Sequence, residues 1–344
     1  MPTLNKTKKE TKIILKWGGI FLLIIFLFLN FGRITGFLKE SFGPPPPPKA
    51  SFGKLPNISF PSKSQENIIY TLDTVSGTLP NFSDRAKVYK ISFLEPTLLA
   101  LDKTQEKVYE IGFNSKGTQI APDVYQWIDQ TSDLQRRITI NIFSSDFTLS
   151  SPYLITPSLQ TLKPNDQDNA VELAKSFLSS MSLLPADLDL EKTKMTYYSI
   201  EKSALVKTSK ISNAKIVRVD FFQKDLDSLP IYYEKGTSNF DFLIGKENNQ
   251  LKVVGVRYFY KNISKNSSTY AIKSASEAFL ELKQGKAYLA SKPQGAVEIA
   301  IRKVLLGYYI GEKQQDFLMP IVVFIGDDNF IAYVSAVKDE WISN

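Results

Sequence analysis

An apolar run close to the N-terminus constrains the fold of this chain more than any other feature. From Trp17 to Gly32 the sequence contains no charged residue. A helix needs about 20 apolar residues to cross a bilayer. Apolar residues on both flanks extend the run to that length if Lys16 and Arg33 reach out to the lipid headgroups. We therefore predict a single transmembrane helix at residues 13–34.

The charges around this run predict its orientation. Five lysines precede it, whereas only Arg33 and Lys39 follow closely. Because positive charge stays on the cytoplasmic side, we expect residues 1–12 to be a cytoplasmic basic tail and the body to be extracytoplasmic. A cleaved signal peptide is the alternative. Cleavage requires small residues after the apolar run, and Asn30 and Phe31 are bulky there. The sequence thus favours a single-pass cell-membrane protein.

Asn30 is the one strongly polar side chain within the apolar run. An amide in hydrocarbon gains about 0.6–2 kcal/mol from an interhelical hydrogen bond. Asn30 is therefore our candidate for a helix–helix contact with a partner membrane protein.

The net charge of the chain is concentrated in this N-terminal region. The whole sequence carries 42 basic and 35 acidic residues, a formal charge of +7. Residues 1–39 hold seven of the basic residues against Glu10 alone, so they account for +6 and leave +1 for the rest. Nucleic-acid binding requires a basic surface, for which the body has no surplus. We therefore predict no nucleic-acid partner.

The sequence contains no histidine and no cysteine. Disulfides, thiolate nucleophiles, Ser-His-Asp triads and zinc sites built on Cys or His are excluded. A Ser-Lys dyad or a carboxylate site needs neither residue, but no spacing singles one out. We interpret Asp327 and Asp328 as part of a hairpin turn, and Asp187, Asp189 and Glu191 as a solvated loop. We accordingly predict no catalytic residue, no metal and no cofactor.

Proline dominates the stretch after the predicted span. Pro44 to Pro48 form an uninterrupted run, and Pro56 and Pro61 continue the irregular character. A polyproline II run of this length reaches about 15 Å. We interpret residues 35–66 as a Pro-rich linker that lifts the body off the headgroups; a recognition motif for a proline-binding domain is the alternative.

The next region, residues 67–160, is expected to be a β-rich α+β domain. Runs rich in β-branched and aromatic residues predict strands at 68–72, 86–93, 124–128 and 138–142. Between them Pro96 can open a helix that Gly112 closes. Its apolar positions would be Leu98, Leu101, Val108 and Ile111.

A second α+β region is expected at residues 165–344. Asp166 or Asp168 would cap a helix with Val171, Ala174, Phe177 or Leu178, and Met181 at helical spacing, ended by Pro185. Strands follow around 195–200, 216–222, 240–244 and 251–260. The fold class is thus α+β, with a helix and antiparallel strands used repeatedly.

The same order recurs after residue 270. Ser274 and Glu277 form a capping box, and Gly285 is the natural residue after the helix end. Three strands follow at 297–309, 318–325 and 330–337, and the apolar phase of the first slips across Arg302-Lys303, which predicts a β-bulge. The expected buried residues are Ala275, Phe279, Leu282, Ile299, Val304, Val322, Phe324 and Val334.

Three tyrosines are candidates for a binding surface. Tyr288, Tyr308 and Tyr309 would either line a peptide groove, since exposed aromatic residues can carry binding energy, or simply belong to the core.

The C-terminal residues resemble the C-terminal part of YycI and YycH proteins. The resemblance rests on the capped helix at 270–286 ending in Leu-x-x-Gly, the Leu-Gly-Tyr-Tyr strand at 303–309, the strand with Pro320 near its start, and the Tyr-Val strand at 331–337. It covers residues 165–340 in layout. It implies tandem domains similar to the PepSY module in a membrane-anchored regulator of a bacterial sensor kinase, and it carries over no catalytic residue.

Three kinds of function remain open from the sequence. The first is a regulatory or interaction protein of the cell envelope that binds a partner membrane protein or a peptide through its outer domain and span. The alternatives are a structural envelope protein and an envelope hydrolase with a Ser-Lys or carboxylate site.

Overall fold

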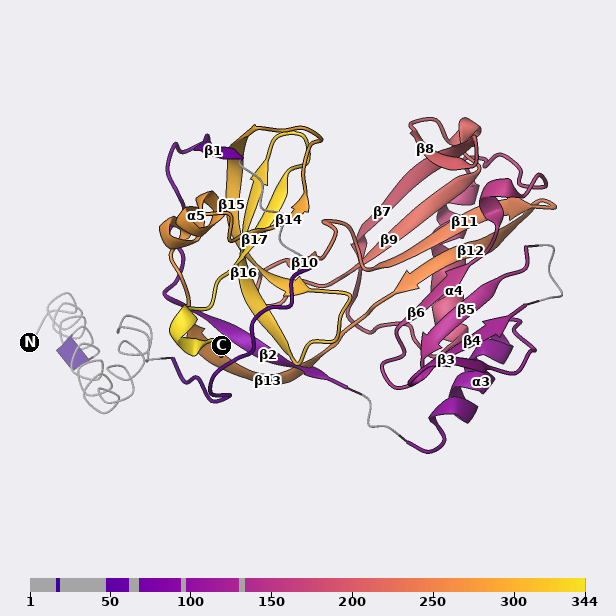
Figure 1. Cartoon of the computed structure of the whole chain (residues 1–344), viewed down its shortest axis with the longest axis horizontal. Helices are drawn as coiled ribbons and strands as arrows, with labels where there is room; N and C mark the ends of the chain where they lie inside the picture. Colours follow the sequence, from indigo (N-terminus) through magenta and orange to yellow (C-terminus); the bar gives the residue numbers. More distant parts are fainter. Residues whose placement is uncertain (1–16, 19–47, 62–67, 94–96, 130–133, 344) are drawn as a thin grey trace, which may run out of the picture. The chain divides into compact units, whose positions relative to one another are not determined.

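The computed structural model describes residues 17–18, 48–61, 68–93, 97–129 and 134–343 (Figure 1). The chain divides into two units, Met1–Pro48 and Lys49–Asn344. Trp17 and Gly18 are helical; the remainder of the predicted span at residues 13–34, with Asn30, lies outside the described residues. Within the described ranges, no helix has the length and apolarity needed to cross a bilayer. All elements below belong to the second unit.

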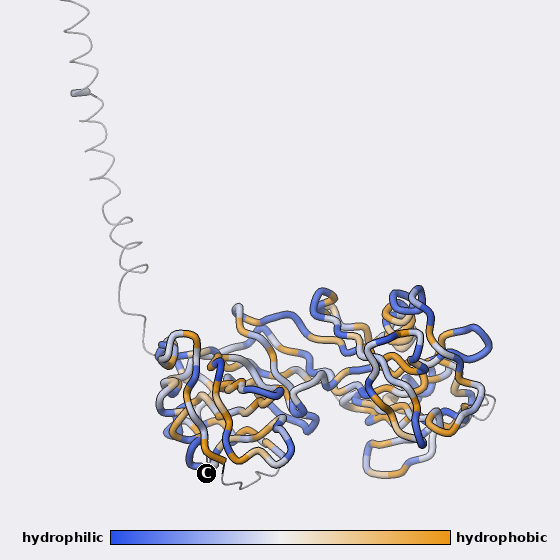
Figure 2. The backbone as a smooth tube through the Cα atoms, turned by 90° about the horizontal axis from the view of Figure 1, so that it is seen from above, coloured by the Kyte–Doolittle hydropathy of each residue, from blue (hydrophilic) through white to orange (hydrophobic). Residues whose placement is uncertain are grey.

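The described residues form a mixed α+β fold that is mostly β, with two sheets and three α-helices. Short 3₁₀ turns lie at Tyr153–Ile155, Ile211–Asn213 and Asp339–Trp341. In Figure 2 many of the loops at the surface of the body are hydrophilic, whereas hydrophobic stretches run through its interior. The predicted fold class is therefore confirmed at the level of α+β.

The first sheet has nine strands and is antiparallel throughout. In spatial order they are β3 (Thr118–Ala121), β4 (Val124–Ile128), β5 (Arg137–Asn141), β6 (Phe147–Ser150), β12 (Gln250–Tyr258), β11 (Phe240–Glu247), β9 (Ile216–Gln223), β7 (Leu188–Glu201) and β8 (Ala204–Thr208). Strands from both predicted regions therefore share this sheet, because β6 pairs with β12.

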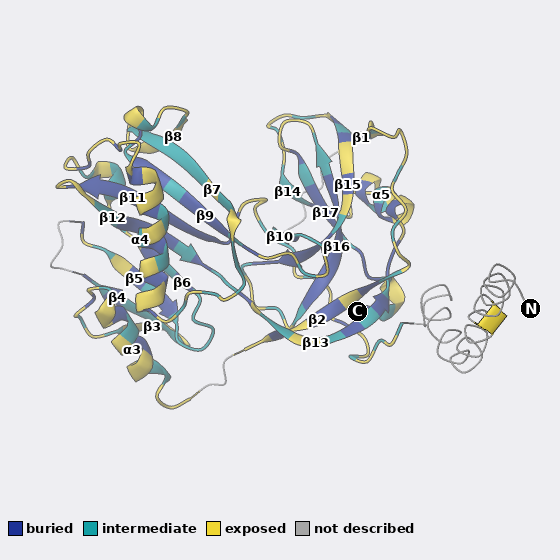
Figure 3. Ribbon diagram, turned by 180° about the vertical axis from the view of Figure 1, so that it is seen from behind, coloured by how far each residue is buried: buried dark blue, intermediate teal, exposed yellow. Residues whose placement is uncertain are grey.

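Helices α3 (Ala100–Glu110) and α4 (Asp166–Ser180) pack on the same core of this sheet (Figure 3). On α3, Val108 is fully buried and Leu101 packs against the core, as predicted. Leu98 is an exception, since it precedes the helix and is fully exposed.

Helix α4 buries the predicted positions Ala174, Phe177 and Leu178, but its cap differs from the prediction. The N-cap is Asn165, and its side chain makes no capping hydrogen bond. Asp166 instead lies inside the first turn, where its carboxylate accepts a hydrogen bond from the Lys163 amide and pairs with the buried Lys246. The tertiary contact with Lys246 thus directs this side chain away from a capping position.

The second sheet has eight strands and is mixed. Its main path is β1 (Ile69–Leu72), β15 (Glu298–Ile310), β16 (Phe317–Gly326), β17 (Ile331–Ser335) and β14 (Tyr288–Ser291), to which β10 (Ile231–Tyr233), β2 (Arg85–Ser92) and β13 (Asn262–Ala271) are added. β1 and β10 run parallel to β15, each along a different part of it. The expectation of antiparallel pairing alone is therefore wrong for this sheet.

Helix α5 (Ala275–Lys283) covers one face of the eight-stranded sheet. The Ser274 hydroxyl accepts from the Glu277 amide at 3.2 Å and the Glu277 carboxylate accepts from the Ser274 amide at 2.7 Å, so the capping box is confirmed. The register of β15 against β16 shifts between Ile301 and Lys303, which confirms the bulge.

One predicted core residue of this region is only half-buried. Ala275, Ala278 and Leu282 form the buried stripe of α5, and Phe279 lies one position to its side. The Phe279 ring contacts Phe324 with centroids 6.0 Å apart, and the Lys283 ammonium lies 4.6 Å above it. The other predicted core positions are buried: Ala275, Leu282, Ile299, Val304, Val322, Phe324 and Val334.

Candidate functional site

The face of the eight-stranded sheet opposite α5 carries a cluster of tyrosines. Side chains alternate across a strand, so Val322 and Phe324 of β16 point to α5 whereas Ile321 and Val323 point to the other face. We call this second surface the tyrosine face. Its buried residues are Tyr288 from β14, Tyr309 from β15, Ile321 and Val323 from β16, and Tyr333 from β17.

The Leu-Gly-Tyr-Tyr stretch of β15 shapes this face. Gly307 lies where a Cβ atom would come within 2.6 Å of the Tyr232 ring, so a residue with a side chain would clash with that ring. The next two residues point to opposite faces. Tyr309 joins the tyrosine face, whereas Tyr308 packs against Tyr89 and Tyr233 in a separate cluster.

A segment near the N-terminal edge of the body covers the tyrosine face. The half-buried side chains of Ile58 and Phe60 lie on it, while Asn57 before them and Ser59 between them are exposed. The Phe60 ring stacks on Tyr288 with centroids 5.3 Å apart and meets the edge of Tyr309 at 4.8 Å. Figure 1 shows this indigo segment crossing the yellow strands.

The preceding residues are attached through their backbone. The amides of Ala50, Ser51 and Phe52 donate to Thr269, Ser268 and Tyr270, respectively. Leu55 is fully buried; its amide donates to the Trp341 carbonyl and its own carbonyl accepts from the Ser343 amide, both at 2.8 Å. From Lys49 on, the described part of the predicted linker therefore belongs to the body and is not a free spacer.

The three tyrosine hydroxyls of the face differ in their hydrogen bonding. Tyr288 donates to the Glu234 carbonyl at 2.9 Å and Tyr333 to the Tyr233 carbonyl at 3.0 Å. The Tyr309 hydroxyl is buried without a partner, as is the Ser335 hydroxyl on the neighbouring β17. Leaving such a group unpaired costs about 1–3 kcal/mol. The two hydroxyls could therefore still form hydrogen bonds with a ligand on this face.

Burial shifts the acidity of all three phenols. Burial, together with the nearby Glu234 and Glu312 carboxylates, raises the pKa of Tyr288 to about 12 and that of Tyr309 still further. Burial likewise raises the pKa of Tyr333 well above its usual value. The phenols are therefore neutral at physiological pH and act as hydrogen-bonding and stacking groups.

A pocket of about 330 Å³ opens beside the covering segment. One wall is formed by Pro56 to Ser59 and the other by Gln315 in the loop before β16 and by Phe317 and Met319 in that strand. The Gln315 side chain is fully engaged, because its amide donates to the Tyr309 and Phe317 carbonyls and its oxygen accepts from Gly311. These hydrogen bonds hold the Gln315 side chain in place on the β15–β16 side of the pocket.

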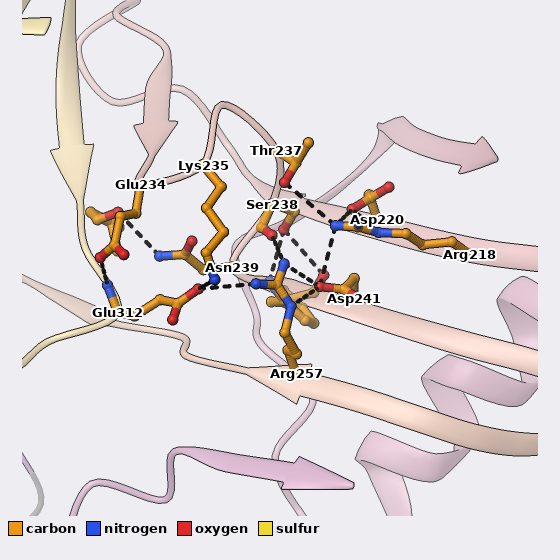
Figure 4. A network of polar contacts seen from close by, with 12 residues as sticks. Arg218, Asp220, Glu234, Lys235, Thr237, Ser238, Asn239, Asp241, Arg257 and Glu312 are labelled. Carbon is orange, nitrogen blue, oxygen red and sulfur yellow. Dashed lines mark hydrogen bonds and ion pairs between the residues drawn. The ribbon is translucent and has the colours of Figure 1, made fainter. Parts of the chain in front are cut away.

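A second polar feature connects the two sheets through charged groups (Figure 4). Arg257 of β12 donates to Asp241 at 2.8 Å, to Glu312 at 3.0 Å and to the Ser238 carbonyl at 3.0 Å. Glu312 follows β15 and also pairs with Lys235 at 2.9 Å. The network therefore fixes the end of β15 to the nine-stranded sheet.

The same network holds a pair of neighbouring carboxylates. Asp220 and Asp241 face each other across β9 and β11, and Arg218 lies 2.7 Å from the first and 3.4 Å from the second. Burial raises the pKa of Asp220, which the Arg218 charge partly offsets and the Asp241 charge increases. Each carboxylate thus forms an ion pair with an arginine. Among the described residues no group of three acidic side chains is arranged to hold a metal ion.

The sequence candidates have the following positions. Tyr288 and Tyr309 lie together on the tyrosine face, at 8% and 1% exposure, and Tyr308 is buried elsewhere in the core. Asn30 lies outside the described residues. The sequence analysis did not identify Ile58 and Phe60, because the prolines around them indicated a linker. The alternation of apolar and polar residues in Ile58-Ser59-Phe60 is the signal that could have indicated a segment packed on the body.

No protein-family model and no curated protein sequence matches this chain. Among solved structures, the chain is similar to an uncharacterized protein from Eubacterium rectale ATCC 33656, with 13% identity and a TM-score of 0.39. That match covers 74% of this chain and 84% of the other.

Proposed function

We propose that this protein is a membrane-anchored regulatory protein of the YycI/YycH type, whose extracytoplasmic body binds a partner membrane protein such as a sensor kinase. In this proposal residues 13–34 form the anchor and Asn30 contributes to a helix–helix contact. The C-terminal region contributes tandem PepSY-like domains.

The observation that carries the proposal is the attachment of residues 49–55 to the body. A predicted anchor ending at residue 34 is joined to Lys49 by a chain that spans at most about 50 Å when fully extended. Because the Phe52 amide donates to the Tyr270 hydroxyl and Leu55 forms backbone hydrogen bonds at the other end, a displacement of the anchor that pulls this chain taut would act on the body at these residues. Regulation through an anchor requires such a mechanical connection, whereas a passive tether does not.

The experiment is purification of the full chain from membranes in mild detergent, with partner recovery as the measurement. The wild type is expected to retain a stoichiometric membrane protein. Exchange of residues 13–34 for an unrelated span of equal length is expected to reduce that recovery. Leu55→Ser tests the connection and Ser59→Ala, an exposed position in the same segment, is the matched control.

Other results would contradict the proposal. Association with peptidoglycan alone would favour the structural alternative. Turnover of a substrate by the isolated protein in an activity screen would favour an envelope hydrolase. Full protection of residues 66–344 from protease added to intact cells would exclude an extracytoplasmic body.

A further inference from the structure

The covering segment shows what kind of ligand the tyrosine face accepts. Ile58 and Phe60, two residues apart, contact the face, and Asn57 and Ser59 are exposed. An extended chain with apolar or aromatic residues at alternate positions therefore fits the face, as in peptide recognition by sheets. In this structure, Ile58-Ser59-Phe60 of the same chain is such a segment.

The covering segment, residues 56–60, is attached to the body in a different way from residues 49–55, which precede it. Residues 49–55 form backbone hydrogen bonds with the body, as described above. From Pro56 to Phe60, the hydrogen bond between the Phe60 amide and the Ile58 carbonyl lies within the segment. The Ile58 side chain packs on the clusters that contain Met319 and Tyr288, and the Phe60 side chain packs on the second of these. Residues 56–60 can therefore leave the face while Leu55 remains in place.

The covering segment is also an incomplete ligand. It leaves the Tyr309 and Ser335 hydroxyls buried without hydrogen-bond partners, although both belong to strands that form the face. A pocket of about 330 Å³ remains beside it, against Gln315 and Met319. A different segment with a polar group that reaches Tyr309 and a side chain that fills the pocket would bind better than residues 56–60.

We propose that the tyrosine face is a binding site for an extended peptide segment of the partner protein, with apolar or aromatic residues at alternate positions, and that Ile58-Ser59-Phe60 occupies this site in the unbound protein. The inference rests on the proposed function and names its contact surface. Partner binding then displaces residues 56–60, which directly adjoin the chain leading to the predicted anchor.

The first test measures peptide binding by the full chain in detergent micelles. The probe is a fluorescent peptide with the sequence of residues 54–61, Lys-Leu-Pro-Asn-Ile-Ser-Phe-Pro. In the wild type the attached segment competes at an effective concentration of about 1 mM. We therefore expect Phe60→Ala to bind the probe roughly tenfold more tightly than the wild type if the probe's own dissociation constant is about 0.1 mM. Ser59→Ala should bind it as weakly as the wild type.

Two controls locate the site. A probe with serine in place of both Ile58 and Phe60 should not bind. A photoreactive phenylalanine analogue at the position of Phe60 should crosslink to β14, β15 or β17 in the Phe60→Ala protein. Tyr288→Leu in that background should abolish binding of the first probe. Equal probe affinity for wild type and Phe60→Ala, or crosslinks confined to other elements, would overturn the inference.

The second test separates this inference from the proposed function. Partner recovery from membranes is measured for Tyr309→Phe, which removes one hydroxyl and leaves the ring. A loss of recovery without a loss of thermal stability supports the site. Unchanged recovery with Tyr309→Phe and Phe60→Ala would leave the proposed function intact and refute the site. A wild-type dimer that Phe60→Ala dissociates would mean that the occupant is a second copy of this chain, which also contradicts the proposal.

Discussion

Two adjacent tyrosines provide a direct test of the unused hydroxyl on the tyrosine face. Tyr308 and Tyr309 are buried to 0% and 1% exposure in the same strand. The Tyr308 hydroxyl donates to the Lys87 carbonyl at 3.2 Å, whereas the Tyr309 hydroxyl has no partner. Replacement of each tyrosine by phenylalanine removes one oxygen and preserves the ring packing. Tyr308→Phe should therefore lower the stability, whereas Tyr309→Phe should not.

The magnitudes follow from the cost of an unpaired group. Tyr308→Phe breaks a hydrogen bond and leaves the Lys87 carbonyl without that donor, which should cost about 1 kcal/mol of unfolding free energy. Tyr309→Phe removes a hydroxyl that is already unpaired, so stability should stay constant or rise by up to about 1 kcal/mol. With a shift of about 2 °C per kcal/mol, the two variants should differ by about 2–4 °C in Tm.

The assay is thermal unfolding of the full chain in detergent, followed by circular dichroism, with wild type and both variants under one buffer condition. A loss of more than 1 kcal/mol for Tyr309→Phe would refute the reasoning, because it would mean that this hydroxyl has a partner such as a buried water. Equal losses for both variants would refute it as well.

Further predictions concern the helices of the two sheets. Asp166→Ala should cost about 3–5 kcal/mol, because it leaves the buried Lys246 ammonium uncompensated, whereas Glu172→Ala, which breaks an exposed pair on the same helix, should change stability by less than about 0.5 kcal/mol in denaturant titrations. Burial alone would raise the pKa of Asp166, but the hydrogen bonds from Lys246 and the Lys163 amide lower this pKa below its usual value. The stability that this carboxylate contributes is therefore present above its unfolded pKa of about 3.9 and should be lost as the pH falls through its pKa in the folded protein. The unfolding free energies of wild type and Asp166→Asn should accordingly converge in acid unfolding curves. Phe279→Ala should cost about 1–2 kcal/mol and the fully buried Phe324→Ala about 3–5 kcal/mol; equal losses in calorimetry would contradict the half-buried position of Phe279.

Local features of the fold could be predicted because their determinants are close in sequence. The capping box of Ser274 and Glu277 needs only a spacing of three residues. The hairpin turn is another example, because Asp328 and Asn329 have positive φ angles that these residue types tolerate. The bulge after Ile301 was visible as a phase shift within one strand.

The candidate site was predictable only in part. The sequence indicated Tyr288 and Tyr309 as surface or core aromatic residues, and left these two interpretations open. It assigned Phe60 to a linker, because nothing close in sequence indicates that this residue stacks on Tyr288. A contact across more than two hundred residues depends on the assembled sheet.

The sequence by itself determined the helices, most strands and the sides to which their residues point, since periodicity and end signals are local properties of the chain. Only the tertiary structure decided which strands share a sheet, that β1 and β10 run parallel to β15, and that residues 49–61 are attached to the body. It also decided that Tyr309 keeps an unpaired hydroxyl. Strand pairing and hydrogen-bond satisfaction are non-local, because they depend on which segments meet after the loops between them have closed.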